Sequence, residues 1–359
     1  MITGSVAKSA LVWLIVGAWT GGLMGCGGKS LVLDGSPQST PTQDAGPVPV
    51  ARIPDRVRNF RADDTRLYWS TQSYKVQGCV FEDCEHTTVS YGTTEYGVLA
   101  LGAHDLFWTS KTSTTAVLSC SKAGCDGPPR KVIQDTYLNP TELNADGDYF
   151  YWPSEFDTYR CPPSGCGDIP ETVANESSSG ALQFAGDSVY WAHLTYQGTQ
   201  LQSPVLIRRA RKDGSQPPTT VLSFTVTPTG EGFGGFAVDS TTMYWLDELS
   251  HVQSCLIDSC QTAPATTLVS TDTSKRYLQV DELGLYWTES NYSSIEVAVK
   301  FCALAGCPSG PQTLIEAPVG YSDPPFCLSS NYVYWQPPVQ VGDGYTSGPE
   351  VRRIRKPMP

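Results

Sequence analysis

The chain has 359 residues, of which only 17% are charged, while Gly and Pro are frequent at 33 and 27 residues. This composition favours short strands joined by many turns, and beyond the N-terminal stretch no segment shows sustained helical periodicity. The formal net charge of −12 predicts an acidic surface that repels phosphate backbones, so nucleic acid is not an expected partner.

Residues 1–25 have the features of a signal peptide. Lys8 precedes an apolar run over residues 10–19 that is shorter than a membrane-spanning helix. The segment ends in Leu23-Met24-Gly25-Cys26, which resembles the lipobox of bacterial lipoproteins. That resemblance implies that cleavage falls before Cys26, which then carries the lipid and becomes the mature N-terminus. An ordinary secreted protein that is cut nearby is the alternative.

Residues 26–47 are rich in Gly, Ser, Pro and Thr. Such a segment cannot bury enough apolar surface to fold, so we expect a flexible tether. Each buried methylene of an acyl chain contributes about 0.8 kcal/mol, so several chains on Cys26 would anchor the protein stably. We therefore expect a bacterial cell-envelope protein outside the cytoplasm, held by its lipid at the outer membrane or the cell surface.

Residues 48–356 are organised around a doublet of an aromatic residue followed by Trp. The doublet occurs at Tyr68-Trp69, Phe107-Trp108, Tyr151-Trp152, Tyr190-Trp191, Tyr244-Trp245, Tyr286-Trp287 and Tyr334-Trp335. The doublets are on average about 44 residues apart, and a fixed period of this size is typical of a repeat architecture.

Each repeat predicts four strands. Large apolar residues stand eight and six positions before the doublet, as at Phe60 and Ala62, and this period of two predicts a strand with one packed face. The doublet lies in a second strand, and two further strands follow, as at residues 116–120 and 130–133. The sequence therefore predicts an all-β fold, a seven-bladed β-propeller of four-stranded antiparallel blades.

The last repeat lacks a fourth strand. It ends at Val351–Lys356, whereas residues 48–53 precede the first doublet by about the distance at which a fourth strand precedes the other doublets. An open ring would leave strand edges unpaired. We therefore expect the N-terminal strand to complete the last blade and to close residues 48–356 into one domain.

The repeats resemble the YWTD β-propeller family. Tyr286-Trp287-Thr288-Glu289 is similar to the motif that gives the family its name, and Ile207–Ser215 is similar to its third strand and Asp-Gly-Ser turn. Members of that family have six blades, whereas this chain has seven repeats, and Thr follows the doublet only at Thr109 and Thr288. The resemblance implies a secreted or periplasmic propeller.

Ten of the twelve Cys form five pairs with identical spacing. Each pair flanks a predicted turn between the third and fourth strands: Cys79 with Cys84, Cys120 with Cys125, Cys161 with Cys166, Cys255 with Cys260, and Cys302 with Cys307. Facing residues of an antiparallel hairpin have Cα atoms about 4.5–5.5 Å apart, which suits disulfides. Zinc is the alternative, but it needs two pairs to converge, and one pair per blade does not allow that. Disulfides imply an oxidising compartment.

Two blades lack the Cys pair, and one further Cys remains. Blades four and seven are predicted to place Arg209 and Arg353 at the position of the first Cys. Cys327 falls in the first strand of blade seven. We interpret it as a small buried hydrophobic residue, and a reactive thiol near the channel is the alternative.

Catalytic motifs are missing from the sequence. It contains no His-Glu-x-x-His, no Gly-x-Ser-x-Gly and no phosphate-binding loop, and its four His stand at unrelated positions of the repeats. We therefore predict no catalytic residue, no metal ligand and no cofactor, and the sequence favours a protein that is not an enzyme.

In a propeller, the loops that follow the second and fourth strands share one face, here called the loop face. A Tyr stands five residues past the Trp of the doublet at Tyr74, Tyr196 and Tyr292. Exposed Tyr beside polar residues suits protein or glycan recognition, although such rings can also cap gaps between blades. We expect a monomeric binding or scaffold module that recognises a protein or polysaccharide there. The alternative is a lyase or hydrolase that acts on an envelope or external polymer at the channel mouth.

Overall fold

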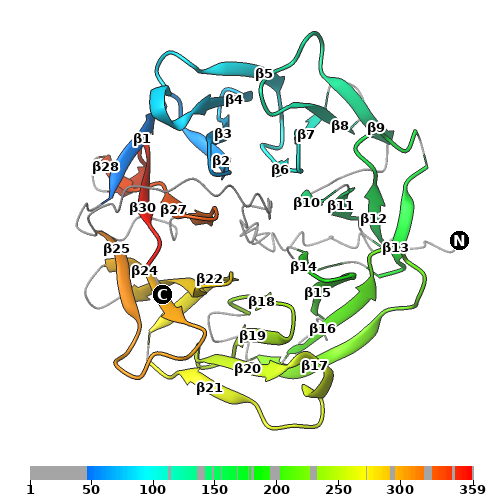
Figure 1. Ribbon diagram of the computed structural model, residues 1–359, viewed down its shortest axis with the longest axis vertical. Helices are drawn as coiled ribbons and strands as arrows, with labels where there is room; N and C mark the ends of the chain where they lie inside the picture. The colour runs from blue at the N-terminus through cyan, green and yellow to red at the C-terminus, as the bar shows by residue number, and fades with distance from the viewer. Residues whose placement is uncertain are drawn as a thin grey trace, which may run out of the picture.

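The computed structural model describes residues 47–357, except 112–114, 136–141, 148, 155, 168, 177, 179–181, 195–202, 227–232, 272, 292–295, 319–325 and 342–343. Within this part of the chain, seven four-stranded antiparallel sheets surround a common axis, with the first strand of each sheet innermost (Figure 1). The fold is therefore the predicted seven-bladed β-propeller. No helix in the described residues has the length and apolar character needed to cross a membrane.

Blades one to six each use four consecutive strands. Blade one contains β2 (Val57–Ala62), β3 (Arg66–Thr71), β4 (Lys75–Val80) and β5 (Val89–Thr93), and blade two contains β6 (Leu99–Leu101), β7 (Asp105–Lys111), β8 (Thr115–Ser121) and β9 (Arg130–Asp135). Blade three contains β10 (Asn144–Asp146), β11 (Tyr149–Pro153), β12 (Thr158–Cys161) and β13 (Glu171–Ala174), and blade four contains β14 (Gln183–Ala185), β15 (Ser188–Leu194), β16 (Ser203–Arg211) and β17 (Thr219–Val226). Blade five contains β18 (Phe236–Val238), β19 (Thr242–Leu246), β20 (Val252–Leu256) and β21 (Thr266–Val269), and blade six contains β22 (Ser274–Val280), β23 (Gly284–Asn291), β24 (Glu296–Ala303) and β25 (Gln312–Pro318).

Blade seven combines the two ends of the chain. It contains β26 (Phe326–Leu328), β27 (Tyr332–Trp335), β30 (Glu350–Arg355) and β1 (Val48–Arg52). β1 runs antiparallel to β30 with Val48 opposite Arg353, and Figure 1 shows the blue strand beside the red one. This confirms that the N-terminal strand completes the last blade. A hairpin of β28 (Pro338–Val341) and β29 (Gly344–Ser347) lies between the second and third strands of this blade, and the sequence did not predict it.

The aromatic doublets form the core between blades. Neighbouring residues of a strand point to opposite faces of its sheet, so each doublet contributes one ring to each of two interfaces. Seven buried clusters in the described part of the chain pair Tyr68 with Trp108, Phe107 with Trp152, Tyr151 with Trp191, Tyr190 with Trp245, Tyr244 with Trp287, Tyr286 with Trp335 and Tyr334 with Trp69. The doublet is therefore the element that joins each blade to both of its neighbours.

Acidic residues fix the turns between first and second strands. Asp63 Oδ1 accepts hydrogen bonds from the backbone N–H groups of Thr65 and Arg66, both at 2.9 Å. Asp239 and Asp281 make the equivalent bonds in blades five and six. This arrangement is the usual role of Asp in a tight turn.

Three turns between first and second strands are also joined to the next blade. In each case the contact comes from a Lys that follows the third strand of that next blade. Lys122 Nζ lies 3.3 Å from Asp63 Oδ2 and connects blades two and one. The same contact joins Lys212 to Asp146 and Lys356 to Asp281. We call these contacts the interblade Lys–Asp pairs. They add an electrostatic link to the apolar clusters that hold neighbouring blades together.

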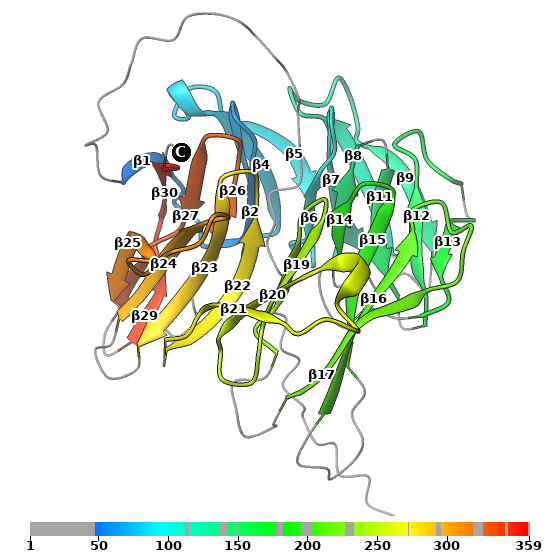
Figure 2. The same cartoon turned by 60° about the horizontal axis from the view of Figure 1, so that its bottom comes forward.

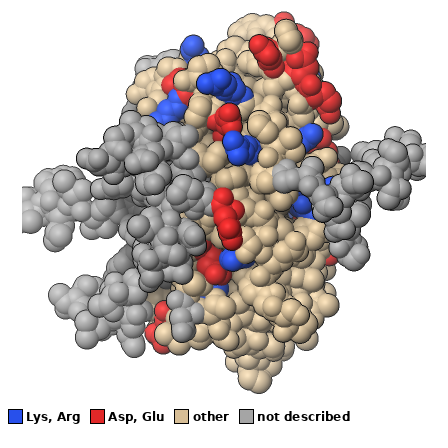
Figure 3. Space-filling view, turned by 90° about the vertical axis from the view of Figure 1, so that its left-hand side faces the viewer, with Lys and Arg blue, Asp and Glu red and all other residues tan. Residues whose placement is uncertain are grey.

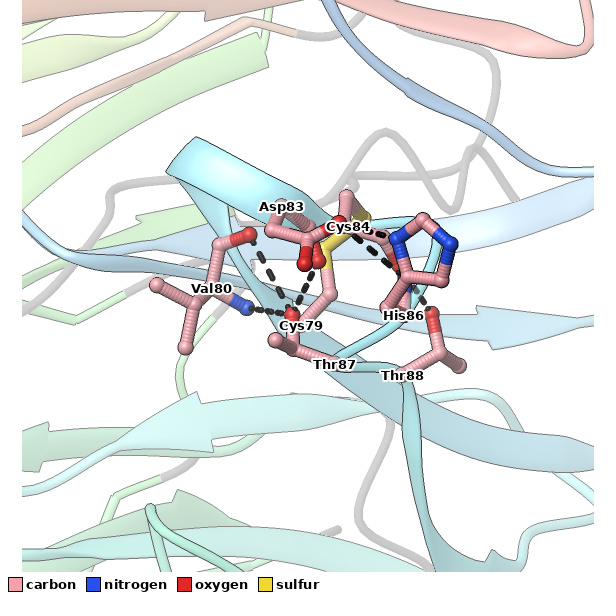
Figure 4. The surroundings of a disulfide bond; sticks show 7 residues. All are labelled: Cys79, Val80, Asp83, Cys84, His86, Thr87 and Thr88. Carbon is pink, nitrogen blue, oxygen red and sulfur yellow. Dashed lines mark hydrogen bonds and ion pairs between the residues drawn. A yellow bond between two sulfur atoms is a disulfide. The ribbon is translucent and has the colours of Figure 1, made fainter.

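All five predicted Cys pairs are disulfide-bonded, with Cα–Cα distances from 4.8 to 5.5 Å. The bonds join Cys79 to Cys84, Cys120 to Cys125, Cys161 to Cys166, Cys255 to Cys260, and Cys302 to Cys307. Figure 4 shows the first of them, which encloses a short 3-10 turn, Phe81–Asp83. The backbone N–H of Val80 donates to Thr87 Oγ1 at 3.0 Å, so hydrogen bonds and the disulfide hold the same turn.

The prediction that Arg209 and Arg353 occupy the position of the first Cys in the two blades without a disulfide is wrong by one residue. In blade one, the residue before the doublet lies opposite the first Cys. The equivalent register places Ala210 opposite Val189 in blade four and Ile354 opposite Val333 in blade seven. Arg209 and Arg353 are the preceding residues, so they lie on the other face of the sheet. Counting along the sequence missed this because these hairpins offer no Cys to set the register.

Cys327 is fully buried in the cluster shared by blades seven and one. Its burial confirms the interpretation of Cys327 as a small buried residue.

Candidate functional site

The described part of the loop face includes blade one, where the predicted residue Tyr74 lies in the turn between β3 and β4. The Tyr74 residue is 47% exposed, and Cζ of Arg58 lies 4.9 Å from the centroid of its ring. Arg58 Nη1 donates to the carbonyl of Glu95 at 2.8 Å. The ring is thus presented to solvent beside a guanidinium group that is held in place.

The backbone of Tyr74 is in the left-handed region, with a φ of 68°. The turn imposes this conformation, because the Tyr74 N–H donates to the carbonyl of Thr71 at 3.0 Å and its own carbonyl accepts from Thr94 at 2.7 Å. Gly or Asn normally occupies such a position, and a bulky residue there costs on the order of 1 kcal/mol or more. Ser250 stands at the same place in the repeat of blade five and has a φ of 61°.

Other aromatic residues near the loop face differ in what the structure shows of them. Tyr196 and Tyr292 lie outside the described residues. Phe233, in the loop before blade five, packs against Phe224 and Phe236 with ring centroids 5.8 and 6.3 Å apart. Phe233 therefore fills a gap between strands, which Tyr74 does not do.

The loop face is uneven in height. The strands β16 and β17, with nine and eight residues, extend beyond the neighbouring blades (Figure 2). The projecting end is the one at which Ser203 pairs with Val226, away from the turn that joins the two strands. Arg208 of β16 forms an ion pair with Glu176, which lies in the loop between blades three and four. The pair fixes the base of this projection against the preceding blade.

Two opposite charges lie on the inner part of the ring. Arg61 belongs to the innermost strand of blade one, and its Nη1 donates to Asn59 Oδ1 at 2.7 Å. Glu142 immediately precedes the innermost strand of blade three. Burial raises the pKa of Glu142 to about 7, and the positive charge of Arg61 opposes this shift. Glu142 therefore changes its protonation state near neutral pH.

A pocket of about 770 Å³ lies between blades four and five, on the face opposite Tyr74. This second face, here called the turn face, carries the turns between the third and fourth strands. Sequence reasoning placed binding on the loop face and missed the pocket. The available signal was the exchange of a Cys pair for an Arg-rich third strand in blade four.

One side of the ring illustrates how the charged residues are distributed (Figure 3). On the side of the ring seen in Figure 3, acidic and basic residues are interspersed and most of the surface is uncharged. Among the described residues, no group of three or more His, Cys, Asp and Glu is arranged to hold a metal ion.

Comparison with solved structures gives the same class of fold, a β-propeller. The structure of U3-55K has a TM-score of 0.54 at 8% identity and covers 87% of this chain and 98% of that chain. The β-propeller domain of the Trilobed protease from Pyrococcus furiosus has a TM-score of 0.53 at 8% identity, with 83% of this chain and 91% of that chain covered. The WD40 β-propeller domain of Doa1 has a TM-score of 0.48 at 11% identity, with 87% and 97% covered.

At identities this low, the two structures with TM-scores above 0.5 show a likeness of the fold alone. Searches against protein-family models and against curated proteins found no match to the sequence. The chain is thus a seven-bladed β-propeller, and its similarity to the YWTD repeat rests on the sequence motifs. Because one propeller fold supports many unrelated functions, the function has to be argued from the surface residues.

Proposed function

We propose that this protein is an extracytoplasmic binding module that recognises a protein or polysaccharide through the loop face and is tethered to a membrane by a lipid on Cys26. The conformation of Tyr74 carries the proposal. Gly or Asn would fit the left-handed turn at lower cost, so the Tyr side chain needs a purpose beyond folding. Its exposed ring supplies one, because Tyr offers a partner both apolar area and a hydroxyl group.

The position of Tyr74 in the repeat extends the proposed surface to other blades. Tyr196 of blade four and Tyr292 of blade six stand equally far from their doublets. Three aromatic side chains distributed around one rim suit an extended partner such as a glycan chain or a protein surface. Tyr rings lose little conformational entropy on binding, which favours their use in recognition.

A binding experiment tests this surface. The mature protein is applied to a glycan array and used to capture partners from an envelope extract, alongside a triple variant with Tyr74, Tyr196 and Tyr292 replaced by Ala. We expect the triple variant to lose at least tenfold in affinity for the identified ligand. Ser250→Ala is the matched control, because it alters the same turn position without removing a ring. Equal binding by the triple variant and the wild type would exclude the site.

The lipid anchor has a separate test. Cys26 and Cys327 are the two Cys outside the five hairpin pairs. A sulfur atom that carries a thioether-linked lipid cannot also form a disulfide, so lipidation of Cys26 and a disulfide between Cys26 and Cys327 exclude each other. In a bacterial host, we expect metabolic labelling with a palmitate analogue, and Cys26→Ser should abolish the label and release the protein from the membrane. Detection of a Cys26–Cys327 disulfide peptide in unlabelled wild-type protein would refute the anchor.

A further inference from the structure

The pocket on the turn face is built by two blades. Blade four contributes residues 185–188, 190, 209–211, 216–217 and 219, and blade five contributes residues 240–241 and 256–259. Its floor includes Tyr190, which is only 2% exposed, and its blade-five wall includes the 3-10 turn Ile257–Ser259. Both walls are therefore ordered parts of the sheets and their turns.

The junction between blades seven and one offers an internal comparison. Blades four and seven both lack the hairpin disulfide, and their third strands end in the same pattern, Arg-Arg-x-Arg-Lys, at residues 208–212 and 352–356. Arg209 lies with its Cζ 5.8 Å from the ring centroid of Tyr190 in blade four. Arg353 lies 4.4 Å from the ring of Tyr332 in blade seven, which stands at the position of Ser188 in blade four.

The two junctions differ in the residue that the following blade inserts. Phe81 begins the 3-10 turn of blade one, stacks on Tyr334 with ring centroids 5.0 Å apart and lies 5.2 Å from Cζ of Arg353. Ile257 begins the equivalent turn of blade five. Ile is smaller than Phe and has no flat ring to cover the guanidinium. At the junction of blades four and five the smaller residues Ser188 and Ile257 thus stand where Tyr332 and Phe81 stand at the other junction, and both line the pocket.

The open junction presents two guanidinium groups with weak internal partners. Arg209 Nε donates to Ser188 Oγ at 3.0 Å, but its Nη1 lies 3.5 Å from Asp258, whose side chain is 96% exposed. Arg211 Nη2 lies 3.8 Å from Asp187, whose side chain is 86% exposed, and its Nε lies 3.5 Å from Asp213, whose side chain is 48% exposed. Long ion pairs with hydrated carboxylates contribute little. A ligand carboxylate can therefore replace these Asp groups and bind the planar guanidinium through two hydrogen bonds.

Apart from Asp187 and Asp258, the remaining lining is uncharged and mixes polar with apolar side chains. Hydroxyl and amide groups come from Ser188, Gln216, Thr219, Ser240 and Thr241. Such groups exchange hydrogen bonds with the hydroxyl groups of sugar rings. Leu256 is 62% exposed at the same pocket and offers apolar surface to the C–H face of a sugar. A volume of about 770 Å³ lies within the usual range for small-ligand sites.

From these observations we propose that the pocket between blades four and five binds an acidic oligosaccharide, with a uronate carboxylate held by Arg209 and Arg211. The neutral side chains receive the sugar hydroxyl groups. This site is distinct from the loop face, so it does not depend on the function proposed for Tyr74.

Calorimetric titration of the mature protein with trigalacturonate tests the proposal. The same trisaccharide with its carboxyl groups reduced to alcohols measures the contribution of charge, and triglutamate measures binding of a peptide with the same charges. We expect trigalacturonate to bind, the reduced sugar to bind at least tenfold more weakly, and triglutamate to bind more weakly than trigalacturonate. Absence of binding at millimolar trigalacturonate, or tighter binding of triglutamate, would overturn the assignment.

Variants locate the binding at this pocket. Arg209→Met is expected to weaken trigalacturonate binding at least tenfold, and Arg353→Met is the matched control that leaves it unchanged. Ile257→Phe copies the residue of blade one, so it should plug the pocket and abolish binding while the protein keeps its thermal stability. The triple Ala variant of the loop face should bind trigalacturonate as the wild type does. Wild-type binding by Ile257→Phe, or equal losses for Arg209→Met and Arg353→Met, would contradict the proposal.

Discussion

Replacement of Lys by Met in the interblade Lys–Asp pairs should destabilise the ring in proportion to the burial of each pair. Met keeps much of the apolar stem of Lys and removes the charge. The Lys356 side chain is 3% exposed and that of Asp281 is 18% exposed, whereas the values for Lys122 and Asp63 are 18% and 22%. Breaking a buried pair costs about 3–5 kcal/mol because the remaining charge stays desolvated, and an exposed pair is worth about 0–1 kcal/mol.

The surroundings of Asp281 refine this estimate. Its Oδ1 also accepts from the backbone N–H groups of Leu283 and Gly284, at 2.8 and 3.1 Å, and these bonds continue to stabilise the carboxylate. We therefore expect Lys356→Met to cost about 3 kcal/mol, at the low end for a buried pair. The pair of Lys122 and Asp63 is partly buried and lies between these two limits, so Lys122→Met should cost less, about 1 kcal/mol.

Urea unfolding followed by Trp fluorescence measures the loss of unfolding free energy in both variants, because the Trp of every doublet is buried. At about 2 °C per kcal/mol for a domain of this size, Tm should fall by about 6 °C for Lys356→Met and about 2 °C for Lys122→Met. The double variant Lys356→Met/Asp281→Asn should recover part of the loss, since it leaves no unpaired charge. The reasoning is refuted if Lys356→Met costs no more than Lys122→Met, or if the double variant recovers nothing.

Three further predictions concern closure, pH and backbone strain. Deletion of residues 48–53 uncovers the edge of β30 and should remove most of the stability, so a circular-dichroism melt like that of the wild type would contradict the closure. Because the pKa of Glu142 rises on folding from 4.5 to about 7, the folded state favours its protonated form. Stability should therefore fall as pH rises from about 4.5 to 7, and urea titrations of Glu142→Gln should show a smaller fall than those of the wild type. Tyr74→Asn relieves the left-handed strain and should leave stability unchanged or raise it by up to about 1 kcal/mol while ligand binding falls. Ser250→Asn should raise stability by a similar amount without affecting binding. A loss of stability above about 1 kcal/mol in Tyr74→Asn would contradict the argument that the Tyr74 backbone is strained.

The fold was predictable because the doublet serves two interfaces at once. Tyr190 packs with Trp245 of the next blade, while its neighbour Trp191 packs with Tyr151 of the preceding blade. A repeat that lost either ring would weaken its contact with one neighbouring blade, and the doublet is therefore visible in every repeat of the sequence. The closing strand was predictable because the last repeat lacked a fourth strand, which residues 48–53 could supply.

The pocket was not predictable, because it depends on local differences that the repeat pattern does not contain. It exists because Ile257 stands where Phe81 stands in blade one, and because Arg209 lies on the face opposite to Ala210. Without a Cys pair in blade four, the sequence did not set the register of its hairpin to within one residue. The conformation of Tyr74 was hidden for another reason, since residue type alone favours Gly or Asn in a left-handed turn.

Pairing of β1 with β30 sets an order of events during synthesis. Val48 is made before the strands of blades one to six, yet the residue opposite to it, Arg353, is made only after them. Sheets one to six can assemble as soon as their own residues have been made, whereas the seventh has to wait for β30. A product truncated before residue 350 would keep six sheets and an uncovered first strand. Such a product would be open to proteolysis, so the architecture itself distinguishes a closed ring from an open one.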